Sequence, residues 1–233
     1  MDQTTVTKED WLAARKAFLD REKAFTRDRD ALSAARRALP RYEVAQTYTF
    51  EGAKGAETLD QLFGGRTQLA VQHFMFGADW DEGCPSCSFW LDNLDRTAVH
   101  LAHRDCAYVS VAHAPYAKLQ AYWDRMGWTS PVYSSAGSTF NYDFGVSFRA
   151  EDLEAGAQVY NYRKGGFGGP EAPGISVFAR EGDKVFHTYS TFGRGLDMMN
   201  GAYHLMDLLP KGRDEDALPY GMAWLKRRDA YGG

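Results

Sequence analysis

The sequence predicts an α/β domain preceded by a helical arm, and two observations carry that prediction. From residue 68 onward, strand-like and helical periodicities alternate, an order that requires parallel neighbouring strands joined by crossover helices. The first forty residues instead carry a seven-residue repeat of apolar side chains. A chain of 233 residues has room for one large domain with an appendage. We therefore predict an arm at 1–40 and a domain at 41–233.

The sequence of the arm predicts one long helix, or two helices separated by a break near Thr26. Its apolar repeat consists of Trp11, Phe18, Phe25, Leu32 and Leu39. The positions between them are weak, so the pattern is half of a coiled-coil seam. Thr7 is suited to cap the start, and Pro40 ends the run. We expect this stripe to cover the chain's own domain, with a homodimer through the N-terminal helix as the alternative.

The first half of the domain switches repeatedly between strand-like and helical spacing. We predict a strand at 42–50, a helical turn at 59–63, a strand at 68–76, a helix from 85 to 101, a strand at 107–112, a helix at 116–126 and an extended segment at 128–133. The run QLAVQHFMF at 68–76 is nearly all apolar, as expected of a central strand buried on both faces.

The second half opens with an irregular insert at 134–174 that is rich in glycine and aromatic residues. Its aromatic side chains predict internal packing, or alternatively a pocket lining; they are Phe140, Tyr142, Phe144, Phe148, Tyr160 and Tyr162. Two alternating runs at 175–180 and 185–191 flank a short glycine-containing turn and predict a hairpin. A closing helix is predicted at 196–209.

Composition and charge exclude several classes of function. Lys and Arg number 27 against 31 Asp and Glu, for a net charge of −4, so the chain lacks the basic face that nucleic acid requires. The basic run at 226–228 and Arg194 predict solvent exposure or ion pairing. Apolar runs are too short to cross a membrane, and the charged N-terminus is unlike a signal peptide. We predict a cytoplasmic protein without nucleic-acid or membrane partners.

The most informative feature is a Cys-x-x-Cys pair formed by Cys84 and Cys87. Three cysteines are too few for a disulfide scaffold, so the pair predicts redox chemistry or metal binding. Cys84 falls at a predicted helix N-terminus, where free N–H groups favour a thiolate. Pro85 suits the first helical position. We therefore expect Cys84 to attack a substrate disulfide and Cys87, one turn further, to resolve the intermediate.

Two other interpretations of the pair stay open, namely inert buried thiols and half of a zinc site. Zinc requires two further ligands. His100 and His103 lie about four turns along the same predicted helix, too far to share a metal with Cys84. Cys106 should open a strand without a nearby partner. We predict a dithiol that binds no metal and needs no cofactor.

Long strings of the sequence resemble a bacterial thioredoxin-like family catalogued as domain-of-unknown-function family 899. They are SAARRALPRYEV, HFMFGADWDEGCPSCSFW, HAPYAKLQAYWDRMGW, GSTFNYDFGV, VFHTYSTFGRG and MDLLPKGRDE, and they run over nearly the whole chain. The resemblance implies a thioredoxin-like fold, with a central mixed sheet flanked by helices, and an N-terminal helical extension. The family name carries no established reaction.

The wider thioredoxin pattern transfers in part. It implies a Cys-x-x-Cys at the start of the first core helix, where Cys84 and Cys87 fall. It also implies a cis-proline that faces the thiols and exposes backbone to an extended substrate; Pro173 resembles that residue, with Pro170 as the fallback. The usual Trp-Cys-Gly-Pro-Cys is here GCPSC, and the preceding strand holds no buried acid. His73 on that strand is expected to be hydrogen-bonded, with assistance to Cys87 as the alternative.

These observations predict a thiol–disulfide oxidoreductase whose partner is a protein or small-molecule disulfide or thiol. One alternative is a thiol-dependent peroxidase at Cys84. The segment before Cys84 lacks the proline and hydroxyl of the peroxiredoxin pattern, and its three acids, Asp79, Asp81 and Glu82, are expected to raise the thiol pKa. A second alternative is a non-catalytic thioredoxin-like binding module.

Overall fold

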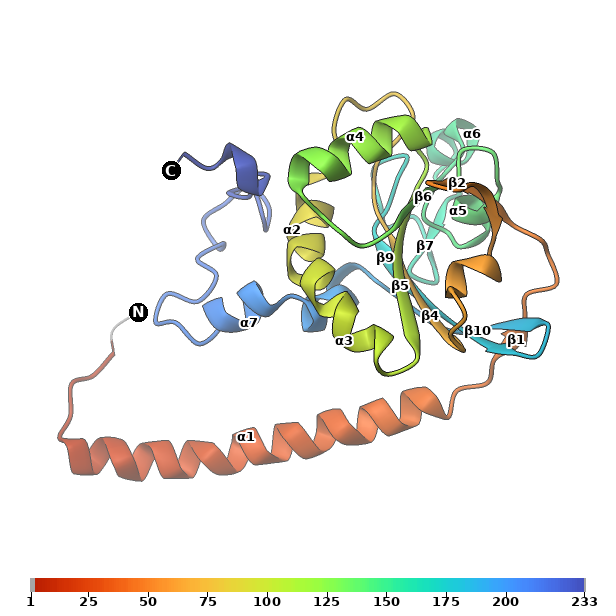
Figure 1. Cartoon of the computed structure of the whole chain (residues 1–233). Helices are drawn as coiled ribbons and strands as arrows, with labels where there is room; N and C mark the ends of the chain where they lie inside the picture. The colour runs from red at the N-terminus through yellow and green to blue at the C-terminus, as the bar shows by residue number, and fades with distance from the viewer. Residues whose placement is uncertain (1–2, 233) are drawn as a thin grey trace. The chain divides into compact units, whose positions relative to one another are not determined.

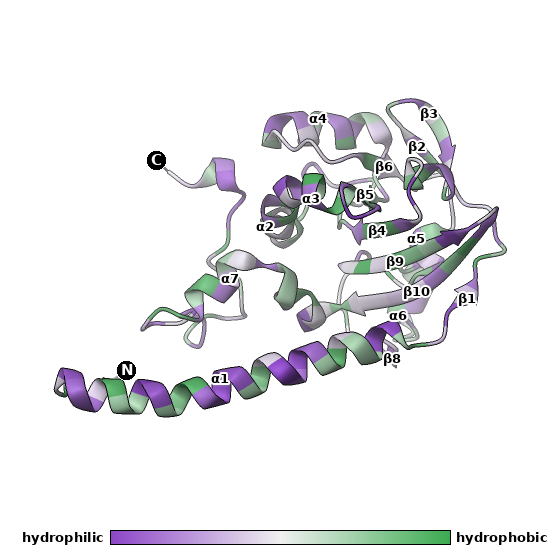
Figure 2. Ribbon diagram, turned by 60° about the horizontal axis from the view of Figure 1, so that its bottom comes forward, coloured by the Kyte–Doolittle hydropathy of each residue, from purple (hydrophilic) through white to green (hydrophobic). Residues whose placement is uncertain are grey.

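The computed structural model describes residues 3–232, and the chain divides into two compact units at the boundary between residues 41 and 42 (Figure 1). The first contains the single helix α1 (Lys8–Arg37), which runs through Thr26 without a break. The hydroxyl of Thr7 accepts a hydrogen bond from the Asp10 N–H at 3.1 Å and caps the helix start. No residue of α1 is buried, and green apolar bands alternate with purple polar ones along it (Figure 2).

The second unit is built on an eight-stranded sheet with strand order β1-β10-β9-β4-β5-β6-β2-β3. Its strands are β1 (Tyr42–Glu43), β2 (Thr49–Gly52), β3 (Gly55–Thr58), β4 (Gln68–His73), β5 (Cys106–Ala112), β6 (Val132–Ser134), β9 (Gly174–Glu181) and β10 (Lys184–Phe192). A separate small ribbon pairs β7 (Val159–Tyr160) with β8 (Arg163–Lys164).

Helices cover both faces of this sheet (Figure 1). They are α2 (Pro85–Leu94), α3 (Ala98–Ala102), α4 (Tyr116–Met126), α5 (Phe140–Asp143), α6 (Ala150–Glu154) and α7 (Gly201–Met206), with 3-10 turns η1 (Gln61–Phe63), η2 (Asp95–Thr97), η3 (Gly193–Met199) and η4 (Arg228–Ala230). Within residues 3–232, no helix combines the length and the apolar character needed to cross a membrane.

The topology confirms the predicted thioredoxin-like fold. Strands β4, β5 and β6 are parallel, and the connections between them contain α2 and α4. The hairpin of β9 and β10 is antiparallel and adds to the other side of β4. The central strand order β5-β4-β9-β10, with α2 directly after β4, is the arrangement that the resemblance implies. An N-terminal helix precedes it, also as expected.

Three predicted elements differ from the structure because tertiary contacts override local pattern. The strand predicted at 42–50 divides into β1, which pairs with β10, and β2, which pairs with β3 and β6 at the opposite edge. The helix predicted from 85 to 101 breaks at η2, where the buried Asp95 carboxylate accepts the N–H groups of Thr129 and Ser130 at 2.7 Å each. The closing helix breaks at Asn200, whose side chain caps α7.

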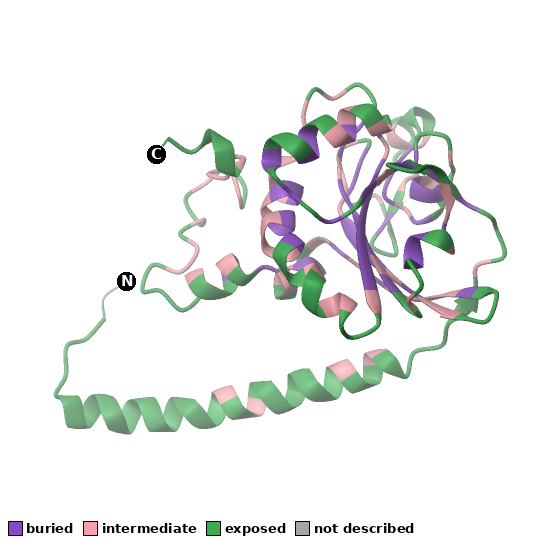
Figure 3. Cartoon of the chain, viewed as in Figure 1, coloured by how far each residue is buried: buried purple, intermediate pink, exposed green. Residues whose placement is uncertain are grey.

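Buried residues are concentrated on the central strands and on the helices beside them (Figure 3). Their side chains form two clusters, one on each side of the sheet. One joins the sheet to η1 and α5, and the other joins it to α2 and α4. The aromatic insert is packed internally, as expected: Phe140 and Phe144 belong to the first of these clusters, and Phe148 and Tyr160 are buried in a separate one. Tyr162 is 73% exposed, so the packing interpretation does not extend to every aromatic residue of the insert.

Candidate dithiol site

Cys84 lies at the junction between the loop that follows β4 and the first turn of α2. Its N–H donates to the Met75 carbonyl at 3.0 Å, and Pro85 follows as the first helical residue. Gly83 is buried just before it, where a Cβ would lie 2.5 Å from the Phe74 ring and 2.7 Å from the Tyr122 ring. Only glycine fits this close approach, which fixes the direction from which the chain enters the helix.

Charged side chains from distant segments hold the loop in front of Cys84. The Lys118 ammonium of α4 donates to the carbonyls of Ala78 and Trp80 at 2.9 Å each. The Arg227 guanidinium, from the C-terminal tail, donates to the Gly83 carbonyl at 2.7 Å and pairs with the Glu82 carboxylate at 2.7 Å. The loop is therefore fixed by charge-assisted hydrogen bonds at both ends.

The environment of Cys84 favours its thiolate. A hydrogen bond from the Cys87 thiol is the largest cause that lowers the pKa of Cys84, and the backbone N–H groups of Cys87 and Ser86 add to it. Burial acts in the opposite direction, and the net result is a pKa of about 6. At pH 7 most of the Cys84 thiol is therefore ionised, as a nucleophilic cysteine requires.

Cys87 has the opposite character. It is 4% exposed, and its hydrogen bond to Cys84, burial and the Cys84 charge all raise its pKa well above the ordinary value. The Met75 N–H donates to its sulfur at 3.4 Å. The Gln72 side chain donates to its carbonyl at 3.3 Å and in turn accepts a 2.7 Å hydrogen bond from Tyr108. Cys87 is thus held in place as a protonated thiol.

The acidic loop does not raise the pKa of Cys84, and that expectation is wrong. Glu82 forms ion pairs with both Arg125 and Arg227, and its hydrogen bond with Arg125 is the largest cause that lowers the Glu82 pKa. The carboxylate is therefore neutralised locally. In the basic run at 226–228, Arg227 and Arg228 form ion pairs and Lys226 is exposed, as predicted. Arg227 also positions the segment that leads into Cys84.

His73 does not face the thiols. Successive side chains of a strand point to opposite faces, and Gln72 takes the face toward Cys87. The His73 ring instead packs 5.6 Å from Phe140 and 6.1 Å from Phe144, between ring centroids. Burial, followed by the charge of His187, lowers the pKa of His73 to about 3. His73 is a hydrogen-bonded core residue, as expected, and the alternative of proton transfer to Cys87 is not supported.

Pro173 lies near the thiols, but its peptide bond is trans, because no cis bond occurs in residues 3–232. The predicted cis-proline is therefore corrected, and this holds for the fallback Pro170 as well. The Pro173 carbonyl accepts a 2.7 Å hydrogen bond from the Tyr160 hydroxyl, so this atom is not free to pair with a substrate. Pro173 and Cys87 nevertheless line the same cavity.

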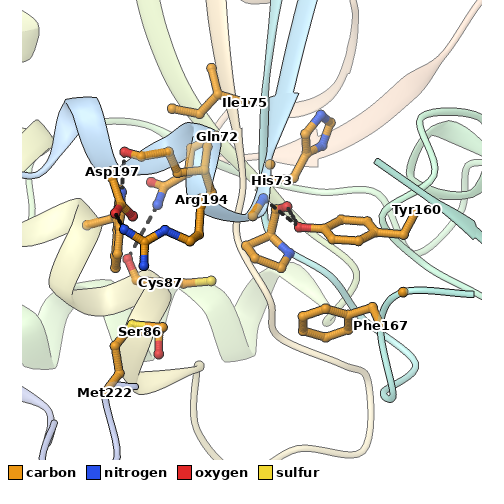
Figure 4. A pocket seen from close by; sticks show the side chains of 16 residues that line it. Gln72, His73, Ser86, Cys87, Tyr160, Phe167, Ile175, Arg194, Asp197 and Met222 are labelled. Carbon is orange, nitrogen blue, oxygen red and sulfur yellow. Dashed lines mark hydrogen bonds and ion pairs between the residues drawn. The ribbon is translucent and has the colours of Figure 1, made fainter. Parts of the chain in front are cut away.

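This cavity, of about 290 Å³, lies beside Cys87, and Figure 4 shows its lining. Most of its walls are apolar, from Trp90, Tyr160, Phe167, Ile175, Leu196 and Met222. Five separate segments contribute them, namely α2, the insert, the start of β9, η3 and the C-terminal tail. Ser86 also reaches the cavity. An apolar site of this kind, with a reactive group at one wall, is suited to bind a small molecule.

The remaining metal-type side chains do not gather at the dithiol. Cys106 starts β5 opposite Gln68, at the end of the parallel pair away from the Cys84 loop. His100 lies on α3, beyond the break at η2. Across the described residues 3–232, no group of three or more His, Cys, Asp or Glu side chains is placed to hold a metal ion.

Sequence reasoning missed one acid near the dithiol. Glu171 is 4% exposed, and its charge is among the causes that raise the pKa of Cys87. Its carboxylate accepts a hydrogen bond from Ser147 at 2.7 Å and contacts His113 at 3.2 Å. The thioredoxin pattern points to the strand before the cysteines for a buried acid, whereas Glu171 comes two residues before Pro173. Its only sequence signal is that position.

The fold and the placement of the cysteine pair at the start of α2 define a thioredoxin-like protein. Residues 1–231 match the family model described as bacterial protein of unknown function (DUF899), and the chain belongs to that family. A search of curated proteins finds no match.

Several solved structures are similar at low sequence identity. Peroxidoxin BcpB from Mycobacterium tuberculosis is 14% identical, with 67% of this chain and 90% of that chain covered and a TM-score of 0.44. Peroxiredoxin Q from Xanthomonas campestris is 12% identical, covering 69% and 95%, with a TM-score of 0.46. A putative thioredoxin from Neisseria meningitidis is 14% identical, covering 65% and 80%, with a TM-score of 0.38. These likenesses are too distant to say what this chain does.

Proposed function

We propose that the protein is a cytoplasmic thiol–disulfide oxidoreductase that uses Cys84 and Cys87. The observation that supports this most strongly is the opposite tuning of the two thiols. The pKa of Cys84 is lowered to about 6, whereas that of its hydrogen-bonded neighbour Cys87 is raised. A dithiol catalyst needs one ionised, nucleophilic sulfur and one protonated sulfur held nearby. Neither inert thiols nor a structural pair requires this asymmetry.

The proposed reaction has two exchange steps. The Cys84 thiolate attacks one sulfur of a substrate disulfide, the S–S bond breaks, and the leaving thiolate takes a proton from solvent. A mixed disulfide now joins Cys84 to the substrate. The Cys87 thiol then loses its proton and attacks the Cys84 sulfur, which releases the second substrate thiolate. Two electrons have passed from the dithiol to the substrate, and a Cys84–Cys87 disulfide remains to be reduced by another dithiol.

A trapping experiment tests this function. In a Cys87→Ser variant treated with bis(2-hydroxyethyl) disulfide, we expect one mixed-disulfide adduct per chain at Cys84, because the resolving sulfur is absent. Intact-mass spectrometry and peptide mapping would identify it. The Cys106→Ser variant serves as the matched control and should be oxidised in the same way as the wild type. A Cys84→Ser variant should form no rapid adduct.

Two results would replace the proposal with its alternatives. Rapid peroxide consumption that persists in Cys87→Ser, together with no disulfide exchange, would indicate the thiol-dependent peroxidase. A measured Cys84 pKa at or above about 8.5, the value of an ordinary thiol, would indicate a non-catalytic binding module. The ultraviolet absorbance of the thiolate, followed against pH in the wild type and in the Cys84→Ser variant, provides that measurement by difference.

A further inference from the structure

We propose that the substrate is a small, uncharged, apolar disulfide that binds in the cavity beside Cys87, rather than an extended polypeptide. This inference rests on the proposed exchange function and names the class of molecule on which it acts. Three features carry it: the backbone before β9 is already bonded within the chain, the cavity is apolar, and the charges at its edge are paired with each other.

The backbone that would pair with an extended peptide is occupied by the insert. The Ala172 N–H donates to the Val146 carbonyl at 2.8 Å, and the Phe148 N–H donates to the Pro170 carbonyl at 2.9 Å. The Pro173 carbonyl accepts from Tyr160. Strand addition requires free N–H and C=O groups along the docking edge. A polypeptide would have to displace these bonds before it could pair here.

The Tyr160 side chain makes two of the hydrogen bonds that hold this backbone in place. Its hydroxyl donates to the Pro173 carbonyl and accepts a 2.9 Å hydrogen bond from the Gly193 N–H. The ring is 6% exposed and forms part of the cavity wall. A single side chain of the insert therefore ties the start of β9 to η3 and closes the same side of the cavity.

The cavity has the size and chemistry for a small apolar group. Its volume of about 290 Å³ exceeds the roughly 150 Å³ of an engineered cavity that binds benzene. Two polar groups beside it, the Gln72 side chain and the Cys87 carbonyl, are already bonded to each other. A ligand with many hydrogen-bonding groups would lose water contacts there and gain few replacements. An alkyl or benzyl substituent makes no hydrogen bonds with water, so it loses none when it enters the cavity.

Charges at the edge of the cavity do not select a charged ligand. Arg194 is exposed and pairs with the Asp197 carboxylate at 3.0 Å. Asp197 also accepts from Arg213 at 2.9 Å, and Arg213 pairs in turn with Asp207 at 2.8 Å. Two basic and two acidic side chains thus balance locally. A substrate with several charges, such as glutathione disulfide, would gain no net attraction and would lose hydration.

The position of the cavity suits both exchange steps. Cys84 and Cys87 are hydrogen-bonded to each other, and Cys87 lines the cavity. An apolar group R carried on the Cys84 sulfur in the mixed disulfide Cys84–S–S–R can therefore lie in the cavity beside Cys87. Attack by Cys87 on the Cys84 sulfur then breaks the mixed disulfide and releases the thiolate RS⁻, which takes a proton from solvent. The substrate RSSR is reduced to two thiols, and the dithiol is oxidised to the Cys84–Cys87 disulfide.

A matched pair of disulfides tests the proposal on the full chain. Dipropyl disulfide and bis(2-hydroxyethyl) disulfide are close in size and differ in polarity at their ends. We measure how fast the reduced protein loses its two thiols with each reagent, relative to the rate with free dithiothreitol. We expect dipropyl disulfide to react about tenfold faster after this correction, since burying two terminal methyl groups contributes roughly 1.4 kcal/mol or more. Oxidised glutathione and insulin should react more slowly than either.

A cavity-filling variant assigns that preference to the site. Met222 is partly exposed, so Met222→Trp should fill the cavity and fold. We expect it to abolish the preference for dipropyl disulfide by slowing the reaction with that reagent, because the apolar group no longer has a cavity to enter. Leu205→Trp adds the same ring at a residue that is 61% exposed and outside the cavity lining, and should behave as the wild type.

A binding measurement separates failure of the inference from failure of the function. Dipropyl sulfide, an unreactive thioether, should raise the melting temperature of the wild type and of Leu205→Trp but not of Met222→Trp. No thiol loss with any disulfide would overturn the proposed function. Exchange at equal corrected rates, exchange fastest with insulin, or no thermal shift with dipropyl sulfide would overturn the substrate class alone.

Discussion

At the scale of single residues, a buried hydrogen-bonded chain crosses the core of the sheet away from the thiols. His73 Nε2 lies 2.7 Å from the Ser176 hydroxyl, which lies 2.7 Å from the Ser190 hydroxyl, which lies 2.7 Å from His187 Nε2. A backbone hydrogen bond with Tyr189 favours the protonated form of His187, so the His187 ring donates to it. Its Nε2 then accepts from Ser190, and His73 donates at the other end.

The buried histidine of this hydrogen-bonded series, His73, is expected to dominate the pH dependence of the free energy of unfolding. The folded-state pKa of His73 is about 3, against an ordinary value of 6.5, so protonation favours the unfolded chain. The contribution is complete above pH 6.5 and is lost progressively as the pH falls toward 3. Between pH 7 and pH 5 we expect the free energy of unfolding to fall by about 2 kcal/mol from this group alone.

The comparison of two variants isolates that contribution. His73→Gln retains a donor toward Ser176 and cannot titrate, so its unfolding free energy, from urea denaturation at pH 7 and pH 5, should fall less than that of the wild type. His100 is exposed, and His100→Gln should retain the wild-type pH dependence. Parallel curves for wild type and His73→Gln would show that His73 is not held neutral in the fold.

At the scale of elements, the C-terminal tail supports the loop that leads into Cys84. Arg227 bonds the Gly83 carbonyl, the Glu82 carboxylate and the Tyr122 hydroxyl. In Arg227→Ala the carbonyl loses its charged donor, and Glu82 loses one of its two cationic partners. We expect the unfolding free energy to fall by about 1–3 kcal/mol, and the pKa of Cys84 to rise above about 6.

Thiolate absorbance against pH and urea unfolding measure these two effects separately. Lys226→Ala removes a neighbouring positive charge from an exposed residue and is the control for net charge. If Arg227→Ala loses stability but retains the Cys84 pKa, Arg227 is a structural anchor only. If neither quantity changes, the tail does not support the loop.

How well each element could be predicted depends on whether its signal is local. The helix at 116–126 and the hairpin were evident because their periodicities run unbroken between clear turn signals. Cys84 at the start of α2 was evident from the proline that follows it. Arg227 and Glu171 were not, since both act on the dithiol through long-range contacts that leave no spacing in the sequence. The break at η2 likewise depends on Asp95 meeting the backbone of residues 129 and 130.

At the scale of the whole molecule, we propose that α1 joins two copies of the chain. The five repeat side chains, Trp11, Phe18, Phe25, Leu32 and Leu39, are 50–67% exposed. Four of them recur along the 30-residue helix α1, of which no residue is buried, and Leu39 follows just after its end. Helices in proteins gain most of their stability from packing of such a stripe, and a seven-residue repeat is the spacing that a second helix matches. The same helix of another copy is the partner that the sequence of this chain itself provides.

Sedimentation velocity tests the dimer. We expect a mass of about 52 kDa, twice the 26.1 kDa of the chain. The double variant Phe18→Gln/Phe25→Gln should sediment as a monomer, because it removes two apolar side chains from the centre of the stripe, whereas glutamine is compatible with a helix. Lys16→Gln/Lys23→Gln changes the opposite face of the helix with the same residue type and should remain dimeric.

A wild-type mass of 26.1 kDa at micromolar concentration, or dissociation of both variants alike, would contradict pairing through this stripe. Since Cys84 and Cys87 lie in the other unit, we expect the thiol exchange rate per chain to be the same in the monomeric variant.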